Sequence, residues 1–204
     1  MFDQVIQSYG KTDLSLAQYL DRDGCNEIND FFTEYNFEQK VEYAHSAEGT
    51  NYRIIAGDDE KEKSIFFRRK DVDVPIPFVE ESMGNQNLLR LLPAFLYVLK
   101  KGGMLLIDEF SSGFHNQLES LMVRYFMQKS KNAQMIFVSH STNLLSNSIL
   151  RPDQEYTVEF HGNEGSSIHR ISSDQPRSAQ NVEKMYVSGV FGGIPLYHEV
   201  ADEN

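Results

Sequence analysis

Apolar and polar positions alternate with a helical period near the start of the chain and then with the shorter period of strands. A stripe of leucines and alanine between residues 14 and 20 predicts a helix over 12–35, which "DRDGCN" interrupts and "EINDFFTEYNF" resumes. Between 41 and 79, the runs "VEYAH", "NYRIIAG" and "SIFFRRK" predict short strands. "VPIP" at 74–77 is expected to be extended but not central in a sheet, because proline cannot donate to a strand ladder.

A different pattern begins after Glu81. Residues 87–100 are apolar on most faces, which predicts a largely buried helix that Pro93 either kinks or starts. The run 104–107 is entirely apolar, as strands of parallel sheets are. A helix over 115–130 is predicted from an apolar stripe made of Leu118, Leu121, Met122, Tyr125 and Phe126.

The order of these elements predicts the fold class. A second buried strand at 134–139 and a short helix in "STNLLSNS" complete a helix–strand alternation over 87–148, which indicates an α/β fold with a doubly wound, mainly parallel sheet. We expect a smaller α+β region at 1–79 and a second region at 80–204. Within the latter, "EYTVEFH" and "SSIHRIS" flank "GNEG" as a hairpin would, and the glycine-rich end is expected to dock as a loop.

Composition narrows the classes of protein. The chain has 19 Lys and Arg against 30 Asp and Glu, a formal charge of −11, which disfavours a uniformly basic nucleic-acid binder. "FFRRK" at 66–70 is either a local basic patch or the solvated end of an edge strand. Cys25 is the only cysteine, so an intrachain disulfide and a cysteine zinc cluster are excluded. Neither a membrane span nor a secretory signal is recognisable, so we expect a cytoplasmic protein.

Polar side chains follow both predicted strands of the parallel sheet. Asp108 and Glu109 follow the first, and His140 follows the second. Ligands of open α/β sheets bind beyond the carboxyl ends of the strands. There Asp108 could hold a hydrated Mg²⁺, Glu109 could polarise an attacking water, and His140 could contact a terminal phosphate. The alternative is a solvated turn beside a structural histidine.

"ESMGN", residues 81–85, precedes the buried helix. A serine and a glycine at this place offer a hydroxyl and free backbone N–H groups at the positive end of the helix dipole, which is an anion site. The alternative is an ordinary helix N-cap.

The order of these motifs resembles the second half of an ABC-type ATPase, and more closely the AAA/ABC-like ATPases of bacterial abortive-infection and defence systems. The resemblance covers residues 80–197 and implies part of a P-loop NTPase fold. "MLLIDE" matches the Walker B motif, which implies that Asp108 binds Mg²⁺ and that Glu109 is the catalytic base. "FVSH" makes His140 the switch histidine. "RPDQ" and "GGIPLY" also resemble this family, without a chemical role for Arg151, Gln154 or the 189–197 segment.

"ESMGN" matches the signature motif, which implies that Ser82, Gly84 and Asn85 contact ATP. In this family the signature closes over the nucleotide of a partner, whereas Walker B acts in its own chain. The sequence departs from the pattern at Met83, where a second glycine is usual, at Asn85, where Gln is common, and at His115, where the D-loop after "SSG" has Asp.

A phosphate loop, G-x-x-x-x-G-K-[ST], is harder to find. "YGKTD" at 9–13 supplies Gly10, Lys11 and Thr12, but Val5 stands where the first glycine belongs. No other glycine precedes a Lys–Ser/Thr pair. We therefore expect the loop to be supplied upstream, in a longer ATPase, or by another chain.

Three functional hypotheses follow. The first is the ATP-hydrolysing half of a defence ATPase, which associates with itself or with a P-loop-bearing chain and acts on an effector protein. The second is a pseudo-ATPase, kept as an oligomerisation scaffold. A metal-dependent nuclease is the weakest, because the other histidines lack ligand spacing and an acidic surface suits nucleic acid badly. Direct binding of nucleic acid is left open.

Overall fold

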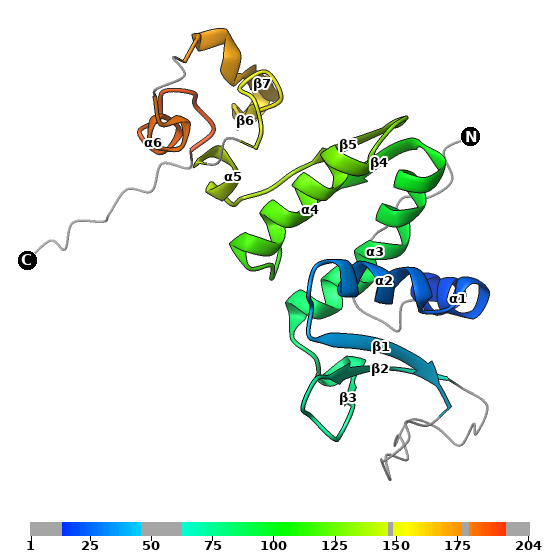
Figure 1. The fold of residues 1–204 in the computed structure, drawn as a ribbon. Coiled ribbons are helices and arrows are strands. Elements are labelled where there is room, and N and C mark those ends of the chain that lie inside the picture. The colour runs from blue at the N-terminus through cyan, green and yellow to red at the C-terminus, as the bar shows by residue number, and fades with distance from the viewer. Residues whose placement is uncertain (1–13, 46–62, 147–148, 177–179, 195–204) are drawn as a thin grey trace, which may run out of the picture.

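The computed structural model describes residues 14–45, 63–146, 149–176 and 180–194. Two helices begin this part of the chain, α1 (Leu14–Asp23) and α2 (Asn26–Glu34) (Figure 1). They are separated at Gly24, whose φ of 71° is a conformation that favours glycine. The predicted pair of helices with a break between them is confirmed.

A small antiparallel sheet follows, formed by β1 (Gln39–Ala44), β2 (Ser64–Arg69) and β3 (Ile76–Pro77). The strand order β1-β2-β3 places β3 at an edge, as the prolines of "VPIP" predict. β2 lies in the middle, so the prediction of an edge strand for "FFRRK" is wrong: the backbone of β2 pairs with a neighbour on each side. "NYRIIAG" lies outside the described residues.

The buried helix α3 runs from Met83 to Lys101, after the short 3-10 turn η1 (Phe78–Glu80). It begins four residues before the predicted start, because Ser82 caps it through a hydrogen bond from the Asn85 backbone N–H (3.3 Å). Pro93 therefore lies inside the helix and does not mark its start. Gly102 ends the helix with a φ of 83°.

The parallel pair that carries the chemistry comes next. β4 (Gly103–Ile107) and β5 (Ala133–Phe137) are joined through α4 (Asn116–Lys129), and α5 (Asn143–Ser146) follows. The predicted order of helix, strand, helix, strand and helix is confirmed, and with it the α/β fold class.

The two strands are less buried than their apolar sequences predict. Leu105 packs into the core with residues of α3 and α4, whereas Leu106, on the opposite side of β4, is 63% exposed. On β5, Ile136 is 47% exposed. Helices cover one side of this sheet, and its other side is apolar and exposed over Met104, Leu106, Ile136 and Val138. We call these four side chains the open sheet face.

The C-terminal part contains the predicted hairpin, β6 (Tyr156–Phe160) and β7 (Ser166–Arg170), joined by η2 (Gly162–Glu164) and followed by η3 (Ile171–Asp174). Residues 185–200 were expected to dock as a loop, but residues 185–187 belong to the helix α6 (Val182–Val187), and residues 195–200 lie outside the described residues. Asn181 makes this helix possible, because its side chain accepts a hydrogen bond from the Lys184 backbone N–H (2.9 Å). Figure 1 shows the hairpin and α6 together, beyond α5 and away from α1 and α2.

One core joins the N-terminal helices to α3 and α4. The ring of Phe31 in α2 meets the ring of Tyr125 in α4 edge-on, with centroids 5.2 Å apart. Phe95 of α3 stacks on the same tyrosine at 6.0 Å. The division into regions 1–79 and 80–204 stays a prediction. Among the described helices, none is long and apolar enough to cross a membrane.

Candidate functional site

The two parallel strands bring the acids and the histidine to one edge. Backbone pairing continues past β4 and β5, since Val138 N–H donates to the Ile107 carbonyl (2.9 Å) and Phe110 N–H to the Val138 carbonyl (2.9 Å). Asp108 and Glu109 are thereby held beside the segment that leads to His140.

A pocket of about 340 Å³ opens at this edge. Its wall consists of polar side chains from the turn after β4, the start of α4 and the segment after β5, with one phenylalanine: Glu109, Ser111, Ser112, Phe114, Asn116, His140 and Ser141. The structure thus brings together the residues predicted as base and switch. Their catalytic roles stay predictions.

The turn that presents Glu109 has an unusual backbone. Glu109 has a φ of 52°, in the left-handed region that residues other than glycine rarely occupy. Asp108 accepts a hydrogen bond from the Glu109 N–H (3.1 Å), and Phe110 is buried against Phe137, with ring centroids 4.8 Å apart. The hydrogen bond on one side and the packing of Phe110 on the other thus maintain a conformation that costs about 1–3 kcal/mol. Such conformations cluster at functional sites.

Asp108 suits a hydrated Mg²⁺ better than a metal bound by protein alone. Its carboxylate is exposed at the end of β4. In the described part of the chain, no three His, Cys, Asp or Glu side chains gather as a metal cage. Mg²⁺ at nucleotide sites takes one or two carboxylates and completes its shell with phosphates and water. The donor set therefore fits Mg²⁺ bound together with a nucleotide.

The predicted signature motif is organised by Glu81, which sequence reasoning left without a role. Glu81 is buried and forms an ion pair with Arg69 of β2. It also accepts hydrogen bonds from Ser82 N–H (2.9 Å) and from the Asn85 side-chain amide (2.7 Å). Ser82 is exposed, so it both caps α3 and faces solvent. The Asn85 side chain instead turns toward Glu81, and its predicted contact with nucleotide is untested.

Two glycines join the signature motif to the turn after β4. A Cβ on Gly84 would lie 2.4 Å from the carbonyl oxygen of Gly113, closer than Cβ atoms come to other atoms in real proteins. The Asn87 side-chain amide also donates to the Ser112 carbonyl (2.9 Å). The start of α3 and the turn that follows Glu109 are therefore in direct backbone contact, which the sequence alone does not reveal.

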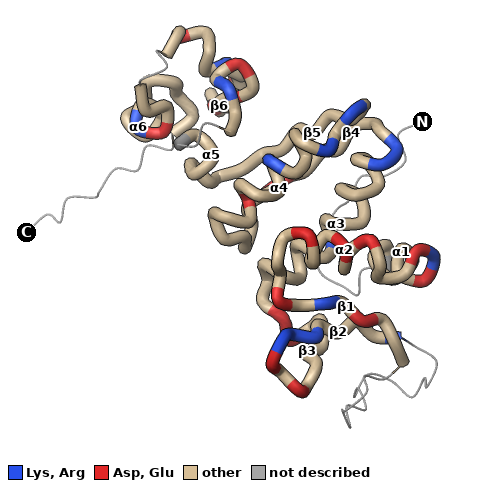
Figure 2. Tube along the Cα trace, viewed as in Figure 1, with Lys and Arg blue, Asp and Glu red and all other residues tan. Residues whose placement is uncertain are grey.

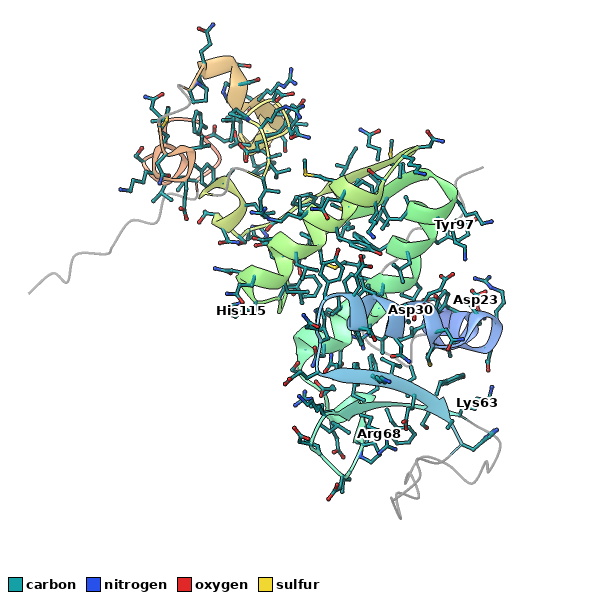
Figure 3. All side chains as sticks on the ribbon, viewed as in Figure 1. Asp23, Asp30, Lys63, Arg68, Tyr97 and His115 are labelled. Carbon is teal, nitrogen blue, oxygen red and sulfur yellow. The ribbon has the colours of Figure 1, made fainter. Side chains whose placement is uncertain are left out.

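His115 stands where the family pattern has aspartate, and it keeps the local function of a helix cap. Its Nδ1 accepts a hydrogen bond from the Gln117 backbone N–H (3.3 Å) at the start of α4 (Figure 3).

Glu119 is the second residue that sequence reasoning missed. The predicted stripe of α4 included Met122 and Phe126, but the buried face consists of Glu119, Met122, Val123 and Phe126. Glu119 is only 1% exposed. The signal was present in the sequence, because residue 119 precedes Met122, Val123 and Phe126 by three, four and seven positions.

The positive charges of "FFRRK", for which a basic patch was one of two alternatives, are largely neutralised. Arg68 binds Glu42 through two hydrogen bonds (2.7 and 3.1 Å), and Arg69 is paired with Glu81. Figure 2 shows acidic and basic residues mixed around β1, β2 and β3. "RPDQ" forms a local turn, in which Arg151 binds Asp153 (2.9 Å) and Gln154 accepts from the Arg151 N–H (3.0 Å).

Comparison with known proteins adds to this geometry. A family model described as "AAA domain, putative AbiEii toxin, Type IV TA system" matches residues 11–146. The match begins earlier than the resemblance seen in the sequence and excludes "RPDQ" and "GGIPLY". Among curated proteins, no significant match is found. A solved structure from work on ATP-driven dimerization and DNA-stimulated activation of SMC ATPases is similar at a TM-score of 0.50 and 12% identity, over 85% of this chain and 94% of that chain.

Proposed function

Because this chain belongs to the family of AAA domains described as putative AbiEii toxins of Type IV toxin–antitoxin systems, we propose that it binds and hydrolyses ATP within a bacterial defence complex. The fold shared with SMC ATPases is consistent with this activity. The observation that carries the proposal is the pocket at the ends of β4 and β5, which Glu109 and His140 line together.

Glu109 and His140, which line the pocket, and Asp108, which does not line it, then have roles. Glu109 polarises the attacking water, and His140 contacts the terminal phosphate and senses its loss. Asp108 holds Mg²⁺, which reduces the negative charge of the phosphates when bound.

Ser82 and Gly84 act on a different nucleotide. Ser82 is exposed at the start of a helix of 19 residues, where its hydroxyl and the helix dipole favour an anion. We infer that this end of α3 closes over ATP held by a partner, so that ATP joins two such units. The similar SMC structure comes from a study of ATP-driven dimerization, which supports this arrangement.

The phosphate loop comes from outside the described residues. The "YGKTD" fragment lies outside them, and it lacks the first glycine of the motif. Leu106 and Val138 of the open sheet face are 63% and 54% exposed. Apolar side chains with this exposure support the idea that further parts of the ATPase pack against this sheet. These further parts of the ATPase would bring the P-loop toward the Asp108 carboxylate.

Replacement of the proposed base tests this function. In the ATPase assembly purified with its natural partners, Glu109→Gln should lower the rate of hydrolysis about 100-fold or more, because the water loses its general base. ATP should then stay bound, which the ratio of ATP to ADP retained after gel filtration measures. Asp30→Asn, a change at an exposed position of α2, is the control. Hydrolysis at the wild-type rate in Glu109→Gln would remove the base assignment.

A further inference from the structure

A buried carboxylate is hydrogen-bonded to the segment that carries His140. Glu119, in the first turn of α4, accepts a hydrogen bond from the Ser139 hydroxyl (3.2 Å) and another from the Ser141 hydroxyl (2.9 Å). The two serines bind different oxygens of the carboxylate, Ser139 binding Oε1 and Ser141 binding Oε2. The two serines flank His140 in the sequence, so both backbone neighbours of the histidine are held by the same side chain.

The same network reaches the turn that carries Glu109. The Ser139 hydroxyl also shares a hydrogen bond with the Ser111 hydroxyl, two residues after Glu109. Ser111 and Ser141 both line the pocket with Glu109 and His140. A chain of hydrogen bonds therefore runs from the buried carboxylate to both sides of the pocket.

Burial makes this carboxylate an unexpected choice of residue. The neighbouring positions of the buried face, Met122, Val123 and Phe126, are apolar, and another apolar residue would fill the site without desolvating a charge. Its hydroxyl donors and its place near the helix N-terminus offset part of that cost. Fully satisfied buried networks fix one arrangement of the groups they join. The Asn143 side-chain amide of α5 also donates to the Glu119 carboxylate (3.5 Å), so this network would fix the pocket edge together with the start of α5.

We propose that Glu119 is a positioning residue, which holds the loop of His140 against the turn of Glu109. The proposal rests on the function assigned to these two residues above. Glu119 itself does not line the pocket. The His140 ring is exposed, so its place depends on the backbone that Ser139 and Ser141 anchor.

Kinetics of the ATPase assembly give the first test. Glu119→Ala should lower kcat for ATP about 100-fold, because small displacements of catalytic groups have effects of this size, with KM little changed. Glu119→Gln should keep most of kcat, since its amide still bonds to hydroxyls. Glu183→Ala is a matched control: it removes a carboxylate that binds Thr142 of the same segment (2.8 Å) but not the serines beside His140. Wild-type kcat in Glu119→Ala would overturn the proposal.

Nuclear magnetic resonance of the 204-residue chain gives a second test that needs no ATP. The ring signal of His140, assigned with His140→Gln, should move in Glu119→Ala and stay in place in Glu119→Gln and Glu183→Ala. Where Glu119→Ala does not fold, Ser139→Ala/Ser141→Ala removes the donors and should move the same signal. An unmoved signal in the variants that lose these hydrogen bonds would overturn the positioning role. An assembly that hydrolyses no ATP would overturn the proposed function alone.

Discussion

Single residues in unusual states identify the parts of this molecule that packing alone does not explain. Glu109 adopts a left-handed backbone conformation, and Glu81 and Glu119 are buried carboxylates held by hydrogen bonds. All three lie at or beside the predicted motifs. Glu155, at the start of the C-terminal hairpin, is another buried acid, 7% exposed, and it lies outside the proposed site.

Glu155 should make stability depend on pH. Burial raises the pKa of its carboxyl from 4.5 to about 7. Between these values the folded chain binds more protons than the unfolded chain, so the free energy of unfolding falls as pH rises from 4.5 to 7. Glu155→Gln should remove this decrease and raise the free energy of unfolding at pH 8 by about 1–2 kcal/mol.

Urea denaturation between pH 4.5 and 8 measures this effect. Glu164→Gln, an exposed change in the same hairpin, should leave the profile as in the wild type. If the free energy of unfolding depended on pH in the same way for Glu155→Gln and wild type, Glu155 would not be the group that causes the pH dependence.

At the scale of elements, the start of α3 and the turn after β4 form one unit. Gly84→Ala would gain about 1 kcal/mol from helix propensity. However, the new Cβ would meet the backbone oxygen of Gly113 at 2.4 Å, which cannot move without the turn. We expect a net loss of about 1–3 kcal/mol in the free energy of unfolding.

Thermal denaturation checks the sign of this change. Met83→Ala, at the adjacent position where the side chain is 63% exposed, should change stability by less than about 0.5 kcal/mol. A Gly84→Ala protein as stable as wild type would show that the two elements separate readily.

The sequence predicts these elements better than their contacts. Periodicity is a local property, so the order of helices and strands from α1 to β7 follows from it. The start of α3 was missed because the apolar run that predicts the helix begins only at Leu88, whereas the Ser82 cap starts the helix at Met83. The contact of Gly84 with Gly113 and the bonds of Glu119 to Ser139 depend on tertiary placement, and no local pattern specifies them.

At the scale of the whole molecule, the open sheet face is the largest departure from what the sequence predicts. The runs "MLLI" and "QMIFVS" indicate strands buried on both sides, but the described helices cover only one side. Exposed apolar patches mark surfaces that pack against other structure. Under the proposed function, the open sheet face packs against further parts of the ATPase. A phosphate loop supplied with those parts would complete the site.

Under the proposed function, one active site uses Ser82 of one unit and Glu109 of another. The most direct test of this arrangement mixes two inactive variants. ATP hydrolysis is measured for the Ser82→Arg assembly, for the Glu109→Gln assembly and for a mixture of the two. In a mixed symmetric pair, one site carries both changes and the other carries neither. We expect each variant alone to be inactive and the mixture to recover about a quarter of wild-type hydrolysis, because half of the pairs are mixed and one of their two sites is intact. A mixture that assembles but stays as inactive as its components would contradict it.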